Sequence, residues 1–214
     1  MHELDFRRLV RADFPLLGRW LATPHVARWW HHDASPAGVE ADFGDTVDGR
    51  DPTDIFVVLL QGRAVGLMQS HAFAHNPGYA QALAPWLELP ARAFSLDYLL
   101  GEPDVLRQGV ASEMLAAFAD TVWWDHPGAS AIVVPVQSGN VASWRALERA
   151  GFRHVADGDL APDNPADGRE HRIYRLDSPR PELSAFPSSR TRPRPAPTAR
   201  RTRPVRSAPA RPAR

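Results

Sequence analysis

Apolar residues over the first 177 positions gather in short runs separated by polar turns rich in Gly, Pro and Asp. Alternating or continuous apolar runs are typical of strands, and apolar residues three or four positions apart are typical of helices. Strands are predicted at 4–10, 54–60, 64–71, 95–100, 131–134, 152–156 and 170–176. Helices are predicted at 14–21, 26–30, 36–47, 114–118 and 140–150. This order of elements gives an α/β sandwich with a mixed central sheet.

Three local features refine this pattern. Asp13 is expected to cap the first helix with its side chain. Trp29 and Trp30 are neighbours in a short helix, and neighbouring helical side chains cannot both point into one core. Either one of them lines a groove, or one is buried while the other is half-exposed. Residues 73–92 contain Pro and Gly but no strong period, so a long loop is expected there, and loops of that length are usually functional or mobile.

The stretch from Ser95 to Phe118 has the pattern of an anion-binding loop. A buried strand at 95–100 carries a single carboxylate, Asp97, and a polar turn follows it. Small residues at alternate positions, Gly109 and Ala111, then lead into a helix. Small residues let consecutive backbone N–H groups approach a phosphate, and the helix N-terminus adds a partial positive charge. The stretch therefore predicts a phosphate cradle.

A second stretch completes a recognisable pair. Asn140 is placed to cap a helix, Gly151 to end it, and Phe152 to begin a new strand. The two stretches resemble the GCN5-related N-acetyltransferases (GNAT), whose acetyl-CoA loop reads Gln/Arg-x-x-Gly-x-Gly/Ala and whose later helix reads Asn-x-x-Ala/Ser…Gly-Phe. Residues 24–30 and 95–100 are similar to the branch that contains aminoglycoside 6′-N-acetyltransferases and siderophore-lysine acyltransferases. The resemblance covers roughly residues 3–177.

The resemblance implies a GNAT fold in which two neighbouring parallel strands splay apart and admit acetyl-CoA. Here those strands end near Leu100 and Val134. The backbone near Leu99 would pair with the pantetheine and polarise the thioester carbonyl, so no metal is required. The residues expected to bind the co-substrate are Leu99, Arg107, Gln108, Gly109, Val110, Ala111, Ser112 and Asn140.

Asp97 is the first candidate for the catalytic base and for binding the acceptor amine. It is expected to be partly buried, which would raise the pKa of its carboxyl group, and it lies twelve residues before Gly109, as in the aminoglycoside branch. The alternative is an aspartate that pairs with Arg92 or caps a loop. His71, at a strand end facing the same region, is the second catalytic candidate, followed by His154 and His171. Trp30, Trp86 and Glu88 are the expected walls of the acceptor site.

Three positions depart from the family pattern. Leu147 stands where many members place the tyrosine that protonates the leaving thiolate, so either Tyr98 or water serves, or the thiolate leaves unprotonated. Pro135 stands where the aminoglycoside enzymes carry an acid that contacts the drug. Leu106 stands at the loop position where Gln or Arg is usual.

Composition narrows the class of protein and divides the chain. There is no cysteine, which excludes disulfides and thiolate chemistry, and neither a membrane span nor a signal peptide is recognised, so a cytoplasmic location is expected. Residues 178–214 carry ten arginines and one acid, whereas residues 1–177 carry 15 arginines and 24 acids. We therefore expect an acetyltransferase domain at 1–177 and a disordered basic tail at 178–214. Any contact with nucleic acid is expected only through that tail. The alternative is that the tail has no partner.

These observations predict an acetyl-CoA-dependent N-acetyltransferase, without a metal, that acts on a primary amine of a small cationic acceptor. An acidic body steers cations toward a cleft, and aminoglycosides are the first named candidates. One alternative is the N-acylation of a siderophore hydroxylysine. Another is a non-catalytic protein that binds acyl-CoA or nucleic acid. The chain is expected to be a monomer or a homodimer.

Overall fold

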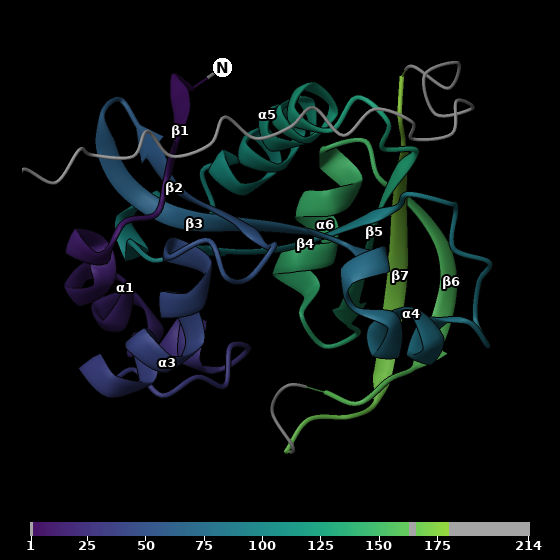
Figure 1. Cartoon of the computed structure of the whole chain (residues 1–214), viewed down its shortest axis with the longest axis horizontal. Helices are drawn as coiled ribbons and strands as arrows, with labels where there is room; N and C mark the ends of the chain where they lie inside the picture. Colours follow the sequence, from purple (N-terminus) through teal and green to yellow (C-terminus); the bar gives the residue numbers. More distant parts are fainter. Residues whose placement is uncertain (1, 163–165, 180–214) are drawn as a thin grey trace, which may run out of the picture.

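A seven-stranded mixed sheet, in the order β1-β2-β3-β4-β5-β7-β6, forms the centre of the protein (Figure 1). The computed structural model describes residues 2–162 and 166–179. Its strands are β1 (Leu4–Arg8), β2 (Asp54–Leu60), β3 (Arg63–Ala72), β4 (Phe94–Leu100), β5 (Ala131–Gln137), β6 (Arg153–Asp159) and β7 (Glu170–Asp177). Neighbouring strands run antiparallel except β4 and β5, which run parallel and are joined at one pair, Phe94 with Ile132.

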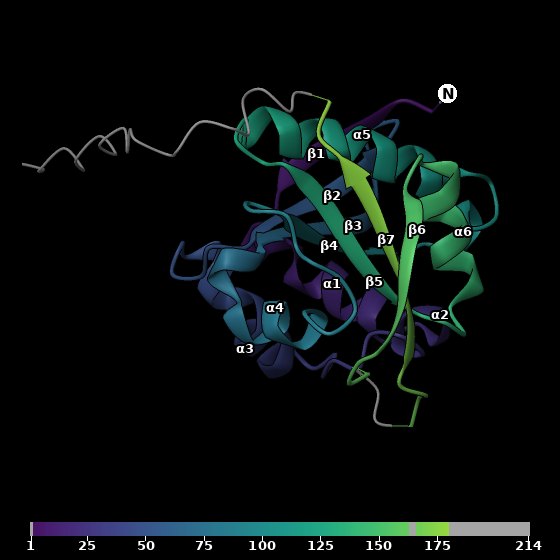
Figure 2. The ribbon, with the colours of Figure 1, turned by 90° about the vertical axis from the view of Figure 1, so that its right-hand side faces the viewer.

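Helices cover both faces of the sheet, as Figure 2 shows. The helices α5 (Val110–Asp125) and α6 (Val141–Arg149) lie on one side, and α1 (Phe14–Leu21), α2 (Pro24–Ala27), α3 (Pro36–Val47) and α4 (Pro77–Leu83) lie on the other. Short 3₁₀ turns occupy η1 (Arg11–Asp13), η2 (Phe73–His75) and η3 (Pro103–Val105). None of the helices within the described ranges has the length and apolar character of a membrane span.

The burial of one stripe of α5 explains its position against the sheet. Met114, Phe118 and Val122 recur every fourth residue and are all buried, so they share one helical face. Phe118 meets the rings of Phe6 and Phe56 edge to face, with centroids 5.1 and 5.3 Å away. On β2, Phe56 and Val58 belong to this core, whereas Ile55 and Val57 on the other face pack with α1 and α3. On β5 and β7, Val133 and Ile173 of that other face pack with α4 instead.

The α/β fold with a mixed sheet is as expected from the sequence, and all seven predicted strands are present in the expected order along the chain. The helix at 36–47 matches α3, and Gly62, with φ +78°, lies in the turn of the β2–β3 hairpin. Three expectations were wrong. The region 73–92 contains α4, the strand predicted at 131–134 continues through Pro135 to Gln137, and α2 ends at Ala27, before the two tryptophans.

Asp13 does not cap α1 with its side chain, which corrects a further prediction. Its carboxylate accepts two hydrogen bonds from the guanidinium of Arg7, each 2.7 Å long, and one from the backbone N–H of Val10. These bonds favour the charged form and hold the pKa of Asp13 below its usual value despite its burial. The residue therefore ties β1 to the start of α1. The basic tail, apart from residues 178 and 179, lies outside the described residues.

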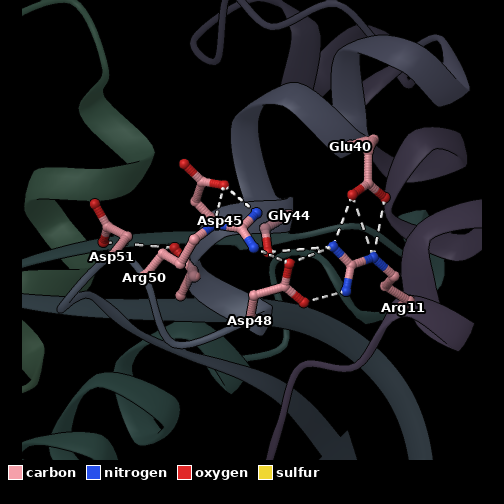
Figure 3. A network of polar contacts seen from close by, with 8 residues as sticks. Arg11, Glu40, Gly44, Asp45, Asp48, Arg50 and Asp51 are labelled. Carbon is pink, nitrogen blue, oxygen red and sulfur yellow. Dashed lines mark hydrogen bonds and ion pairs between the residues drawn. The ribbon is translucent and has the colours of Figure 1, made fainter.

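A network of exposed charges connects η1 with α3 and the turn after it (Figure 3). Arg11 binds the carboxylates of Glu40 and Asp48, and Arg50 binds Asp48 and Asp45. Hydrogen bonds from Arg11 lower the pKa of Asp48 to about 2. Exposed ion pairs are screened by water and salt, so we expect each pair of this network to stabilise the protein less than a buried pair of the same geometry would.

Replacing Gly101 with Ala should destabilise the protein by about 1–3 kcal/mol, because overpacking a filled core has that cost. A Cβ atom at Gly101 would lie 2.0 Å from Cγ of Trp20, whose ring is buried. Urea unfolding of the variant measures the loss. Gly78→Ala is the matched control, since its nearest neighbour would be 3.9 Å away. An equal midpoint for both variants would contradict the packing described for Gly101.

Asp48→Asn should lower the urea midpoint at neutral pH but not in strong acid. A group whose pKa is lower in the folded state contributes stability above its unfolded pKa, about 3.9, and loses it as the pH falls through the folded value. For Asp48 that value is about 2. The midpoints of wild type and variant should therefore converge as the pH falls from about 5 to about 2. A difference that persists unchanged across this range would contradict the role of the charge.

Candidate active site

Beyond Phe94 and Ile132, β4 and β5 diverge, and we call the gap between them the wedge. A first hollow opens here between β4, β5, the segment after α2, the start of α6 and the β6–β7 connection. A second hollow continues from it toward the N-terminal end of α5. The two hollows are continuous, because both are lined by Trp29, Trp30, Tyr98, Asn140 and Ser143. The wedge therefore connects the two faces of the sheet.

Tyr98 bridges the wedge from β4 to α6. Its phenolic oxygen lies 2.6 Å from Oγ of Ser143 and belongs to the α5–α6 side of the sheet. Burial raises the pKa of Tyr98, so the phenol keeps its proton at neutral pH. Ser143 itself is held in the first turn of α6, where its backbone N–H donates to the side chain of Asn140 over 3.2 Å. A protonated hydroxyl group is thus positioned inside the wedge.

Both tryptophans of the segment after α2 line the wedge. The sequence predicts that only one of them lines a groove, or that one is buried and the other half-exposed, and the structure shows neither arrangement. Trp29 and Trp30 are half-buried, and Trp30 also packs against the α1–α3 core. Arg28 lies over the ring of Trp29 at 4.2 Å and binds the carboxylate of Asp167 at 2.6 Å. This ion pair joins the segment after α2 to the β6–β7 connection and closes one side of the first hollow.

Asp97 and His71, the two catalytic candidates from the sequence, lie on adjacent strands. Nδ1 of His71 is 3.8 Å from Oδ2 of Asp97. The carboxylate of Asp97 is 52% exposed and lines the first hollow, so the expectation that it is partly buried within its strand is wrong. Side chains alternate along a strand, and Asp97 faces the side opposite to the core residue Leu96.

His71 lies beside Asp97 and does not line the first or the second hollow. Its side chain is 15% exposed, and its Nε2 atom is buried without a partner among the described residues. Oγ of Ser95, which is paired with His71 across the β3–β4 ladder, is likewise buried without a described partner. His71 therefore lies next to Asp97 without reaching the first hollow, where Asp97 is the exposed one of the two side chains.

The loop before α5 has the geometry of a phosphate cradle. Gly109 caps the helix with a left-handed φ of +84°, and Arg107 also has a positive φ of +62°. The first N–H groups of α5 have no acceptor within the helix and are available to an anion. Arg107 and Gln108 are exposed, Val110 is buried, and the hydroxyl group of Ser112 donates to the carbonyl of Gly109 over 2.8 Å.

The second hollow is mostly apolar and extends from the wedge to this cradle. Leu99, Leu106, Ala111 and Ala146 contribute to its walls. Nε2 of His25 lies 2.8 Å from the carbonyl oxygen of Leu100, so it satisfies one backbone acceptor on the diverging end of β4. A narrow apolar passage that leads to an anion cradle fits an extended chain with a phosphate group at one end.

A third hollow of about 400 Å³ lies next to the first one, over β6 and β7. Trp86 forms one wall, packed over Gly158, and three acidic residues line it, namely Asp157, Asp159 and Glu170. His171 lines both this hollow and the first one. The two hollows therefore lie side by side on the α1–α4 face.

The structure gathers most of the residues expected from the sequence. Trp30, Asp97, Leu99, Ala111 and Asn140 line the first two hollows, and Trp86 lines the third. Glu88 is exposed and lines none of the three.

The sequence did not assign several wall residues to the site, and most of them have no distinguishing local pattern. These are His25, Gln137, Ser143, Pro162 and Asp167. Only Ser143 carried a usable signal, because it lies in the first turn after the capping Asn140.

The sequence matches the family described as Acetyltransferase (GNAT) domain over residues 10–160. That match covers more than half of the chain, so the chain belongs to the GNAT acetyltransferases. None of the curated proteins matches it.

Solved structures with low sequence identity share the fold. Aminoglycoside acetyltransferase AAC(6′)-Ib, in complex with coenzyme A and kanamycin, is 18% identical with a TM-score of 0.68, over 82% of this chain and 95% of that chain. Aminoglycoside N(6′)-acetyltransferase from Legionella pneumophila is 13% identical with a TM-score of 0.61, over 83% and 93%. Ribosomal-protein-S5-alanine acetyltransferase from Vibrio fischeri is 14% identical with a TM-score of 0.63, over 83% and 94%.

The chain is therefore an N-acetyltransferase that uses acetyl-CoA as its co-substrate. The wedge, the apolar second hollow and the cradle at Gly109 fit this molecule in order, from its thioester to its pyrophosphate. The described residues include no cluster of three or more His, Asp or Glu side chains arranged to hold a metal ion.

Ala111→Phe should abolish the stabilisation of the protein by acetyl-CoA. Ala111 lines the second hollow in the first turn of α5, where a large ring would fill the passage to the cradle. Ligand binding at 100-fold saturation stabilises the folded state by about 2.7 kcal/mol, and the shift in melting temperature measures it. Ala116→Phe, on the exposed side of the same helix, is the control and should keep the shift. A normal shift in Ala111→Phe would contradict the assignment of this passage.

Proposed function

We propose that the protein transfers the acetyl group of acetyl-CoA to a primary amine of a small cationic acceptor, with aminoglycosides as the first candidates. The observation that carries this proposal is the position of Asp97. Its exposed carboxylate lies in the first hollow, on the strand that borders the wedge. A carboxylate at this point attracts an ammonium group to the place where the thioester would lie.

The charges around the third hollow support a cationic acceptor with more than one amine. Glu170 makes no side-chain hydrogen bond or ion pair with the other described residues, while Asp157 is bound by His154 and Asp159 by Arg169. The ring of Trp86 offers an aromatic face to a cation beside these acids. A volume of about 400 Å³ lies within the range of small-molecule sites.

The similarity to AAC(6′)-Ib and to the Legionella enzyme supports the same class of acceptor, because both are named as aminoglycoside acetyltransferases. The fold alone does not select this class, since a ribosomal-protein acetyltransferase shares it. The acidic residues of the first and third hollows are therefore the main argument for a small polycation.

The reaction asks little of the protein beyond positioning and proton transfer. The amine nitrogen attacks the thioester carbon, the C–N bond forms, and the C–S bond breaks. We assign the protonation of the leaving sulfur to Tyr98, whose hydroxyl group lies in the wedge and keeps its proton at neutral pH. Leu147, at the position where many GNAT members have a tyrosine, is fully buried.

A thiol-release assay with acetyl-CoA and a panel of amines tests the proposal. The panel contains aminoglycosides, a polyamine, a hydroxylysine derivative and a peptide with a free N-terminus. Aminoglycosides or the polyamine should give the highest kcat/KM. Preference for the hydroxylysine derivative would favour the siderophore alternative, and preference for the peptide would show that the acceptor is a protein.

Asp97→Asn should raise the acceptor KM more than it lowers kcat. The variant keeps the shape of the side chain but loses its charge, and a hydrogen bond to a charged group contributes about 1.5–3 kcal/mol, so kcat/KM should fall about 10- to 150-fold. The KM for acetyl-CoA should hardly change. Steady-state kinetics with both substrates varied gives these values.

Asp5→Asn is the control for this change. Asp5 is exposed on β1, at the far edge of the sheet, and its replacement by Asn removes the same charge from the protein. An acceptor KM that is unchanged in Asp97→Asn, or raised equally in both variants, would contradict a direct role of Asp97 in binding the amine.

A further inference from the structure

His171 lies beside the wedge, across from Asp97. It belongs to β7, where it is paired with Gln137 of β5 and with Gly158 of β6. Its side chain faces the α1–α4 side of the sheet, as does the core residue Ile173 two positions along the strand. His171 is only 9% exposed, yet it lines both the first and the third hollow. Among the described residues, it is the only one that lines both of these hollows.

One hydrogen bond fixes the form of its ring. Nδ1 of His171 lies 2.8 Å from the carbonyl oxygen of Arg169, and a carbonyl oxygen can only accept a hydrogen bond, so Nδ1 carries the proton. In the neutral ring Nε2 then has a free lone pair. Nε2 makes no hydrogen bond to any other residue in the described part of the chain. The hydrogen bond to the carbonyl of Arg169 therefore fixes the ring so that Nε2 is the atom available as a base.

The neighbouring groups are less suited to accept a proton from an amine. Nε2 of His25 is bound to the carbonyl of Leu100, and Nε2 of His71 is buried away from the hollows. Carboxylates as a class are weak bases toward amines, whereas imidazole is the side chain whose ordinary pKa lies closest to neutral pH. Asp97 is thus suited to attract the ammonium group, and a second group is needed to deprotonate it.

We propose that Nε2 of His171 is the general base that deprotonates the acceptor ammonium group at the wedge. This inference rests on the proposed acetylation of an amine. An ammonium group and the thioester yield an amide, a thiol and one released proton. His171 takes the first proton from nitrogen, which frees the lone pair for attack, and passes it to solvent through the third hollow. The second proton passes from nitrogen to solvent after the C–N bond has formed, and the departing sulfur is protonated by Tyr98, which then recovers a proton from solvent.

His171→Asn in the full chain tests the proposal. The amide N–H of Asn can keep the hydrogen bond to the carbonyl of Arg169, but the side chain is no base. We expect kcat for a cationic amine to fall about 10²- to 10⁴-fold, with the KM for acetyl-CoA and its thermal stabilisation of the protein retained. His75→Asn, an exposed position in η2, is the control and should keep the wild-type kcat.

A second acceptor separates a base from a structural residue. An aminooxy analogue of the acceptor carries a nitrogen that is already neutral at the assay pH, so the first deprotonation is not needed. The loss of kcat in His171→Asn should therefore shrink to less than about tenfold with this analogue. A residue that merely holds the hollow in shape would cause the same loss with both acceptors.

Each outcome decides whether His171 acts as a base or only holds the hollow in shape. Wild-type kcat in His171→Asn, or an equal loss with both acceptors, overturns the role of His171 while the proposed function stands. Failure of the wild-type protein to acetylate any amine of the panel overturns the proposed function itself, and the role of His171 with it. Should the Asn variant not fold, His171→Gln, which also lacks a base, is measured with the same two acceptors and judged by the same outcomes.

Discussion

The separation of β4 from β5 is the constraint on which the rest of the site depends. Two parallel strands in the middle of a sheet normally pair along their length, but these two are joined only at Phe94 and Ile132. Beyond that pair, backbone N–H and C=O groups on the facing edges lose their ladder partners and need others. Pro135 fits this arrangement, because proline has no N–H to donate and is tolerated where a strand becomes an edge.

Contacts on both faces of the sheet surround the wedge and give it two chemically different sides. On the α5–α6 side, the hydrogen bond between Tyr98 and Ser143 joins β4 to α6 and places a neutral hydroxyl group near an apolar passage. On the α1–α4 side, the ion pair of Arg28 with Asp167 encloses a polar hollow. A thioester with a long neutral arm suits the first environment, and a charged amine suits the second.

The polar side also divides two tasks that one residue could not perform well. Attracting a cation requires a charge that persists at neutral pH, and an exposed carboxylate such as Asp97 meets this need. Removing a proton requires a free lone pair, and Nε2 of His171 offers one because Nδ1 is bound to the carbonyl of Arg169. The sheet places these residues on different strands that face the same hollow, and this geometry is what the proposed mechanism uses.

The sequence by itself determined most of the elements, because local periodicity and turn chemistry report the burial of each segment, and the resemblance of two of its motifs indicated the family. The helix-forming run at 114–118, the small residue Gly109 before it and the capping Asn140 were all recognisable in this way. The exposure of Asp97, the presence of α4 and the joining of His171 to two hollows were decided only by the tertiary structure. Each of these depends on where two strands stop pairing and on which segments distant in sequence come into contact. The local sequence around a residue does not determine such long-range contacts.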